Sequence, residues 1–238
     1  DGPHIQYCED NNITISRKQI SQSFLARVKD FANPNTAIAL IVTSKILYNG
    51  HPKAKCFRDY FLNNFVVESV VEFSSIRRLA FSKAIGPGAI IFYKISDGNN
   101  TDDCIIEHIS LKQNRFFNLF RMVLIEKFDI KYIQQKYFKL HHWLWKTILY
   151  GNIPDYYFIN RLINEYKTLQ QIIDENEGLI TGVGVQPHGP SEPKDAPHLM
   201  NKYYLNTGDG MLKRYFVETG EESSWPYEIG RASCRERV

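Results

Sequence analysis

The chain has 238 residues, of which 43% are hydrophobic, 13% aromatic and 23% charged, and its net charge is +3. This composition excludes a disordered chain, a fibre and a small disulfide scaffold, because there is enough apolar material for a core. No apolar run reaches the roughly 18 residues of a membrane span, and so small a charge does not by itself indicate a polyanionic partner.

The four cysteines lie far apart and form no CxxC pair; they are Cys8, Cys56, Cys104 and Cys234. This spacing favours neither a zinc site nor a disulfide framework. We therefore expect reduced thiols, no bound metal and a cytoplasmic protein.

Both ends of the chain suggest an interrupted gene. The first residue is Asp1 rather than methionine, and residues 1–13 are mostly polar and predict no helix or strand. Residues 228–238 read like the translation of a common sequencing adapter, the alternative being an ordinary basic tail. Without these residues the net charge would be +2. We expect a gene fragment that is cut at both ends.

The first 110 or so residues alternate between helix and strand signals. A capping box at Ser16–Gln19 precedes apolar residues at helical spacing as far as Phe31, which predicts a helix. The apolar run 37–43 indicates a strand covered on both faces. The other elements expected here are a helix over 53–63 and strands over 65–73, 88–95 and, more weakly, 104–111. This order predicts an α/β fold with a largely parallel sheet, completed by a strand pair within 65–95.

The pattern of apolar and polar residues changes after about residue 112. Residues 114–137 have mixed periodicity, and helices are expected over 143–150 and from Pro154 onward. A second capping box, Thr168–Gln171, opens a short helix. Residues 178–227 are rich in loops and proline.

Short motifs alone indicate no reaction. The sequence GVGVQP at 182–187 lacks the third glycine of a dinucleotide fingerprint and is read as a turn. His141 and His142 are adjacent, so their side chains point apart, and no carboxylate or thiol lies at ligand spacing.

The order of motifs over 15–95 is more informative. It contains the helix QISQSFLARVKDF, the strand and turn AIALIVTSKILYNG, a helix of the K-x-x-R-x-x-L kind at Lys55–Leu62, and the series VVESVVEF…RLAF…GAIIFYKI. This series resembles the region after the catalytic tetrapeptide in N-6 adenine-specific DNA methyltransferases of restriction–modification systems. Thr43 stands where that family commonly has proline, and Gly86-Pro87-Gly88 replaces a stretch that commonly contains Thr or Ser. A looser resemblance continues over 139–206.

The resemblance implies a domain order. Residues 1–112 are expected to form the second half of a Rossmann-like sheet of an S-adenosylmethionine-dependent methyltransferase. A helical connector is expected over 113–178 and the start of a DNA target-recognition region over 179–227.

The resemblance also implies roles for single residues. Phe24 matches the aromatic that flanks the adenine ring of S-adenosylmethionine, the alternative being a core phenylalanine. Phe81 matches the aromatic that stacks on the target adenine after this base has swung out of the duplex. Arg77, Arg78 and Lys83 are candidates for contacts to the DNA backbone, the alternative being a solvated loop.

The catalytic motif of the family is missing from this chain. Methyl transfer there requires a polar-Pro-Pro-aromatic tetrapeptide, and none of the ten prolines is adjacent to another. No strand leads into the glycine-rich turn that holds the cofactor. We therefore expect this chain to be inactive by itself, as the C-terminal part of an enzyme.

The expected parent protein transfers a methyl group from S-adenosylmethionine to adenine N6 at a specific site in double-stranded DNA, without a metal. A restriction nuclease domain or subunit is a candidate partner. One alternative is a DNA-binding or specificity subunit with a decayed methyltransferase core. Another is an RNA or protein methyltransferase with the same fold.

Overall fold

The computed structural model describes residues 2–81, 86–120 and 122–176. The chain divides into two compact units, 1–165 and 166–238. In the described part of the second unit the helix is α10 (Leu169–Asp174). The helices of the first unit are α1 (Pro3–Asp10), α2 (Ile20–Arg27), α3 (Lys45–Tyr48), α4 (Pro52–Asn64), α5 (Arg77–Ala80), α6 (Arg115–Phe120), α7 (Gln135–Leu140), α8 (Leu144–Tyr150) and α9 (Ile153–Glu165), with short 3-10 turns η1 (Val28–Asp30) and η2 (Lys127–Asp129).

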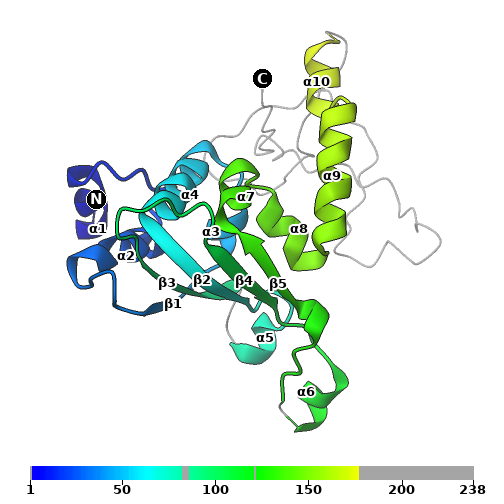
Figure 1. Ribbon diagram of the computed structural model, residues 1–238, viewed down its shortest axis with the longest axis horizontal. Coiled ribbons are helices and arrows are strands. Elements are labelled where there is room, and N and C mark those ends of the chain that lie inside the picture. Colours follow the sequence, from blue (N-terminus) through cyan, green and yellow to red (C-terminus); the bar gives the residue numbers. More distant parts are fainter. Residues whose placement is uncertain (1, 82–85, 121, 177–238) are drawn as a thin grey trace, which may run out of the picture. The chain divides into compact units, whose positions relative to one another are not determined.

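A mixed five-stranded sheet lies at the centre of the first unit, in the order β1-β3-β2-β4-β5 (Figure 1). Its strands are β1 (Ile38–Thr43), β2 (Phe65–Glu72), β3 (Gly88–Ile95), β4 (Ile105–Ser110) and β5 (Ile130–Gln134). Because β3 is antiparallel to both β1 and β2, these two strands run in the same direction. β2 is parallel to β4, and β4 is antiparallel to β5.

The predicted α/β class is therefore confirmed, but the prediction of a largely parallel sheet is wrong. Among the described strands only the pair β2–β4 is parallel. An apolar run carries no mark of strand direction, which is set by the connections. The predicted strand pair within 65–95 is confirmed as the antiparallel pair β2–β3.

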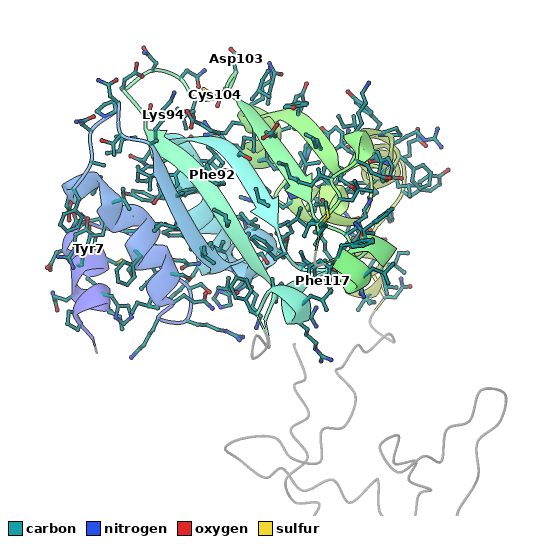
Figure 2. The ribbon with its side chains drawn as sticks, turned by 90° about the horizontal axis from the view of Figure 1, so that it is seen from below. Tyr7, Phe92, Lys94, Asp103, Cys104 and Phe117 are labelled. Atoms are coloured by element: carbon teal, nitrogen blue, oxygen red, sulfur yellow. The ribbon has the colours of Figure 1, made fainter. Side chains whose placement is uncertain are left out.

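Helices cover one face of this sheet. These helices are α4, α7 and α8 (Figure 1). Phe57 and Phe61 of α4, Phe138 of α7 and Trp145 of α8 are buried in one core with side chains of the sheet. The opposite face, which carries Phe92, is turned toward the viewer in Figure 2. No described helix covers it.

Strand β1 is accordingly buried on one face and exposed on the other. Ile38 and Val42 are buried on the helix side, whereas Ile41 is 64% exposed on the other. The prediction that residues 37–43 are covered on both faces is therefore wrong within the described residues.

Local signals located most elements well. Strand β3 and helices α4 and α8 agree with the predicted ranges to within one residue, and Pro154 lies in the first turn of α9. The capping box of α10 is confirmed: the Thr168 hydroxyl accepts from Gln171 N–H at 3.2 Å, and Gln171 Oε1 accepts from Thr168 N–H at 2.7 Å.

The N-terminal predictions are wrong in two places. Helix α1 lies where no element was expected, and its apolar residues Ile5 and Cys8 are buried. Ser16 does not cap α2, because Arg17 and Lys18 have positive φ angles of 48° and 56° that interrupt the helix before Ile20. The backbone N–H of Ser16 instead donates to Gln22 Oε1 at 2.7 Å.

The sheet continues beyond residue 112. Strand β5 pairs with β4, so the expected boundary falls between two neighbouring strands, and the division of the chain comes after Glu165. The ranges 179–227 and 228–238, for which separate expectations were stated, lie outside the described residues. Within the described part of the chain, no helix is long and apolar enough to cross a membrane.

Candidate functional site

The carboxyl ends of β1 and β2 meet at one edge of the sheet, where β3 begins. Ser44 N–H donates to the Pro87 carbonyl at 3.1 Å, and Phe73 N–H donates to the Gly88 carbonyl at 2.8 Å. In open α/β sheets, ligands bind outside the carboxyl ends of the strands. This edge is therefore the expected location of a ligand site.

A buried carboxylate lies at this edge. Glu72, the last residue of β2, has no exposed surface. One of its oxygens accepts from the Tyr48 hydroxyl of α3, and the other accepts from the Ser74 hydroxyl. Ser44 Oγ lies 3.4 Å from Ser74 Oγ. No described cation pairs with Glu72, and the backbone N–H of Ser74 adds to the hydrogen bonds from the hydroxyl groups.

The environment raises the pKa of both acidic groups. Burial raises the pKa of the Glu72 carboxyl above its usual range, although hydrogen bonds from Ser74 and Tyr48 oppose this shift. Burial and the neighbouring Glu72 also raise the pKa of the Tyr48 hydroxyl. Tyr48 therefore keeps its proton and directs it at Glu72.

A cavity of about 360 Å³ lies beside this buried cluster. Tyr48 and Ser74 line it, together with Ser75, Arg77, Pro87, Leu149 and Tyr150. Arg77 Nη1 donates to the Ser74 carbonyl at 3.1 Å, and Arg77 Nε is buried without a hydrogen-bond partner among the described residues. Tyr150 is 75% exposed. Hydroxyl groups, a cation and an aromatic wall suit a polar ligand with a planar part.

Phe81 lies at the same edge, directly after α5. It is 39% exposed, and its ring packs edge-on against Phe73 with centroids 6.0 Å apart. Its N–H donates to the Arg77 carbonyl at 2.8 Å. Arg78 is exposed on the same short helix, and Lys83 lies outside the described residues. The structure thus brings Phe81 and Arg77 together.

Phe24 lies elsewhere. It is 58% exposed on α2 and lines a separate cavity of about 220 Å³ between α1 and α2. Next to it, the Leu25 carbonyl accepts from the Tyr93 hydroxyl at 3.1 Å, and Tyr93 pairs with Ile38 at the amino end of β1. Phe24 and Phe81 therefore lie near opposite ends of β1. A role of Phe24 in cofactor binding stays a prediction.

Arg58 fixes the backbone of helix α3, which carries Tyr48. It is only 4% exposed, and its Nη1 donates to the Ile46 carbonyl at 3.0 Å and to the Asn49 carbonyl at 2.9 Å. Ile46 lies in α3, the helix that ends with Tyr48, and Asn49 is the residue directly after it. Burial lowers the pKa of the Arg58 guanidinium. The arginine of the K-x-x-R-x-x-L pattern thus fixes the helix that presents Tyr48.

The adjacent histidines do not form a site together. His142 Nδ1 accepts from Arg58 Nε at 3.4 Å, and its Nε2 lies 3.4 Å from an oxygen of Asp59. The His141 ring instead packs against Trp143 and Tyr156. Nowhere in the described ranges do three His, Cys, Asp or Glu side chains group in a way that could hold a metal ion.

Sequence reasoning missed Tyr48, Glu72 and Ser74. One signal was available: a glutamate closes the apolar strand FVVESVVE, where a charged side chain is unexpected. An unpaired charge is costly inside a protein, so such a residue indicates partners elsewhere in the chain.

Comparisons with known proteins place this geometry in context. No protein family and no curated protein matches the chain. The chain is similar to the solved structure of the type IIG restriction endonuclease BpuSI, with 16% identity and a TM-score of 0.38, over 58% of this chain and 16% of that one. It is also similar to a structure of a type I restriction–modification system, with 14% identity and a TM-score of 0.43, over 74% of this chain and 41% of that one.

Both neighbours are restriction–modification proteins. The chain spans less than half the length of either matched chain.

Proposed function

We propose that this chain is part of a site-specific DNA methyltransferase of a restriction–modification system, which transfers a methyl group from S-adenosylmethionine to adenine N6. The observation that carries the proposal is an exposed aromatic, Phe81, one helical turn after Arg77 at the carboxyl edge of the sheet. The resemblance over 15–95 supports the same function.

The chemistry of base flipping explains why such a pair is useful. Taking a base out of the duplex costs a few kcal/mol, and stacking on an aromatic ring returns roughly 1–3 kcal/mol. Phe73 holds the Phe81 ring edge-on, which leaves part of that ring free for a base. Arg77 and the exposed Arg78 supply positive charge for phosphates next to that base.

The described residues form only part of a cofactor site. The cavity beside Phe24 offers an aromatic wall for an adenine ring, together with Tyr7, His4 and Arg27. Arg27 there brings a positive charge, which does not suit a sulfonium cation. The described residues therefore fit the adenine ring alone, and they provide no route for methyl transfer.

The test uses the protein expressed from its complete gene. It is incubated with radiolabelled S-adenosylmethionine and, in separate reactions, with mixed-sequence duplex DNA and structured RNA. We expect label in DNA, recovered as N6-methyladenine by mass spectrometry. Label in RNA or in protein would contradict the proposal.

A second candidate is a DNA-binding or specificity subunit without catalysis. A Pro-Pro tetrapeptide in the upstream part of the complete gene would support the enzyme, and its loss there would support this candidate. Specific binding to duplex DNA with no transfer of label would support this candidate. Co-purification with a nuclease would fit either of the two.

A further inference from the structure

The hydroxyl groups beside the cavity have a fixed polarity. When Glu72 is ionised its carboxylate only accepts hydrogen bonds, so Tyr48 and Ser74 both direct their protons at it. Ser44 Oγ lies 3.4 Å from Ser74 Oγ, and either oxygen can be the donor of this contact. What Tyr48 and Ser74 still offer to the cavity is therefore lone pairs.

The rest of the cavity wall is different in character. Arg77 contributes donors and a positive charge, and its Nε is buried without a described partner. Tyr150 contributes a ring that is 75% exposed. A ligand that satisfies this wall carries an N–H donor at one end, a flat ring in the middle and an anionic group nearby.

We propose that this cavity binds a nucleobase with an exocyclic amino group, adenine or cytosine, whose amine donates to Tyr48 and Ser74 while Arg77 holds the adjoining phosphate. This inference rests on the proposed function, because it requires that DNA reaches this edge of the sheet. It goes beyond that function by assigning a base-reading role to Glu72, which acts through the two hydroxyl groups as a positioning residue.

Cytosine and uracil differ in the atom that matters here. Cytosine presents an amine where uracil presents a carbonyl oxygen, and a carbonyl would meet the lone pairs of two hydroxyl groups. A good hydrogen-bonded contact to a base edge discriminates by roughly 1–3 kcal/mol, which corresponds to about 5-fold to 150-fold in affinity. We expect oligonucleotides of cytosine to bind about 10-fold more tightly than those of uracil. This lies in the lower part of the range, because a single amine makes the contact and the cavity is partly open to solvent.

The experiment compares two single-stranded oligonucleotides. The full 238-residue chain is titrated into fluorescein-labelled oligo(dC) and oligo(dU) of equal length, and anisotropy gives the two affinities. Measurement at pH 8 favours the ionised form of Glu72 and keeps oligo(dC) unfolded. Both probes lack a methyl group and carry the same backbone charge, so their difference reports the base edge.

Glu72→Gln is the decisive variant. Its amide can donate to one hydroxyl oxygen, which frees the proton of that hydroxyl for the cavity and removes an acceptor. We expect the preference for oligo(dC) to fall to less than 2-fold, while circular dichroism shows a folded chain. Glu68→Gln is the matched control, because Glu68 lies exposed on the same strand and pairs with Lys94 at 3.1 Å. It should keep the preference.

Two further variants separate the contributions of the wall. Tyr48→Phe removes one acceptor and should reduce the preference even if Glu72→Gln fails to fold. Arg77→Ala should weaken both oligonucleotides equally, because a phosphate contact carries no information about the base.

The outcomes distinguish the inference from the proposed function. If the wild-type chain binds both oligonucleotides equally, or if Glu72→Gln and Tyr48→Phe keep the full preference, the base-reading role is refuted while DNA binding stands. If the chain binds neither oligonucleotide and the complete protein methylates no DNA, the proposed function itself fails.

Discussion

The side chain of Gln135, the first residue of α7, hydrogen-bonds to the backbone at the start of β2. It has no exposed surface, and its Nε2 donates to the carbonyls of Leu62 at 2.6 Å and Phe65 at 2.8 Å. Its Oε1 accepts from Val67 N–H at 3.0 Å. The parallel pairing of β2 with β4 begins only at Ser69, after a register irregularity. Gln135 therefore takes the place of a strand partner.

Replacing Gln135 with leucine keeps the volume of the side chain but removes all three hydrogen bonds. The Leu62 carbonyl keeps its hydrogen bond from Thr101 Oγ1 at 2.8 Å, so two backbone groups lose their partner. Each buried backbone group left without a partner costs roughly 1–3 kcal/mol, so two groups at the lower end of that range give about 2–3 kcal/mol. This is a large share of a typical free energy of unfolding, about 5–15 kcal/mol. Urea unfolding followed by far-ultraviolet circular dichroism measures it, as a shift of the midpoint at unchanged slope.

Gln134→Leu is the control for the same change one residue earlier. Gln134 is half-buried, and its amide lies 3.5 Å from Asp103, at the limit of a hydrogen bond. We expect its effect to stay within about 0.5 kcal/mol. A loss below about 1 kcal/mol for Gln135→Leu would refute the reasoning, since the Phe65 carbonyl and the Val67 N–H would then have found other partners.

Three more predictions concern charge and the site. Burial and the nearby Lys131 lower the pKa of His108 from 6.5 to about 3, so the unfolded chain binds an extra proton between these values. The free energy of unfolding should therefore fall as the pH drops below 6.5, by about 3 kcal/mol at pH 4.5 relative to pH 8. In urea titrations, the His108→Leu variant should not show this contribution to the pH dependence. Arg58→Met should lower the free energy of unfolding by about 2–3 kcal/mol in the same titrations, and Arg58→Lys should not restore it because lysine lacks the planar fork. Phe81→Ala should weaken binding to duplex DNA with an unpaired adenine at least about 5-fold by fluorescence anisotropy, whereas Phe128→Ala, which removes another exposed ring, should not.

Local elements were readable from the sequence because their signals are local. The residues of β3 and the start of α9 follow from apolar runs and a proline in the first turn. The direction of β3 was not readable, since it depends on how the segment 73–87 returns to the sheet. Helix α1 was missed because its apolar side is only Ile5 and Cys8, too few to stand out in a polar segment.

The candidate site was readable only in part, for a related reason. The resemblance pointed to Phe81 and Arg77, which lie four residues apart and are joined by a backbone hydrogen bond. The contact between Tyr48 and Glu72 spans 24 residues and depends on Arg58 fixing α3 against α4. No sequence period encodes such a contact, although the glutamate in an apolar strand marks where to look.

The two departures from the family pattern lie against each other in the fold. Thr43 Oγ1 donates to the Pro87 carbonyl at 3.3 Å, and the next residue, Ser44, donates its N–H to the same oxygen. A proline at position 43 has no hydroxyl to donate to this carbonyl, so threonine adds a hydrogen bond at the last residue of β1. Together the two bonds hold the end of β1 against Pro87, with Ser44 next to Ser74. The departures that loosen the resemblance are therefore the residues that hold the polar wall of this cavity together.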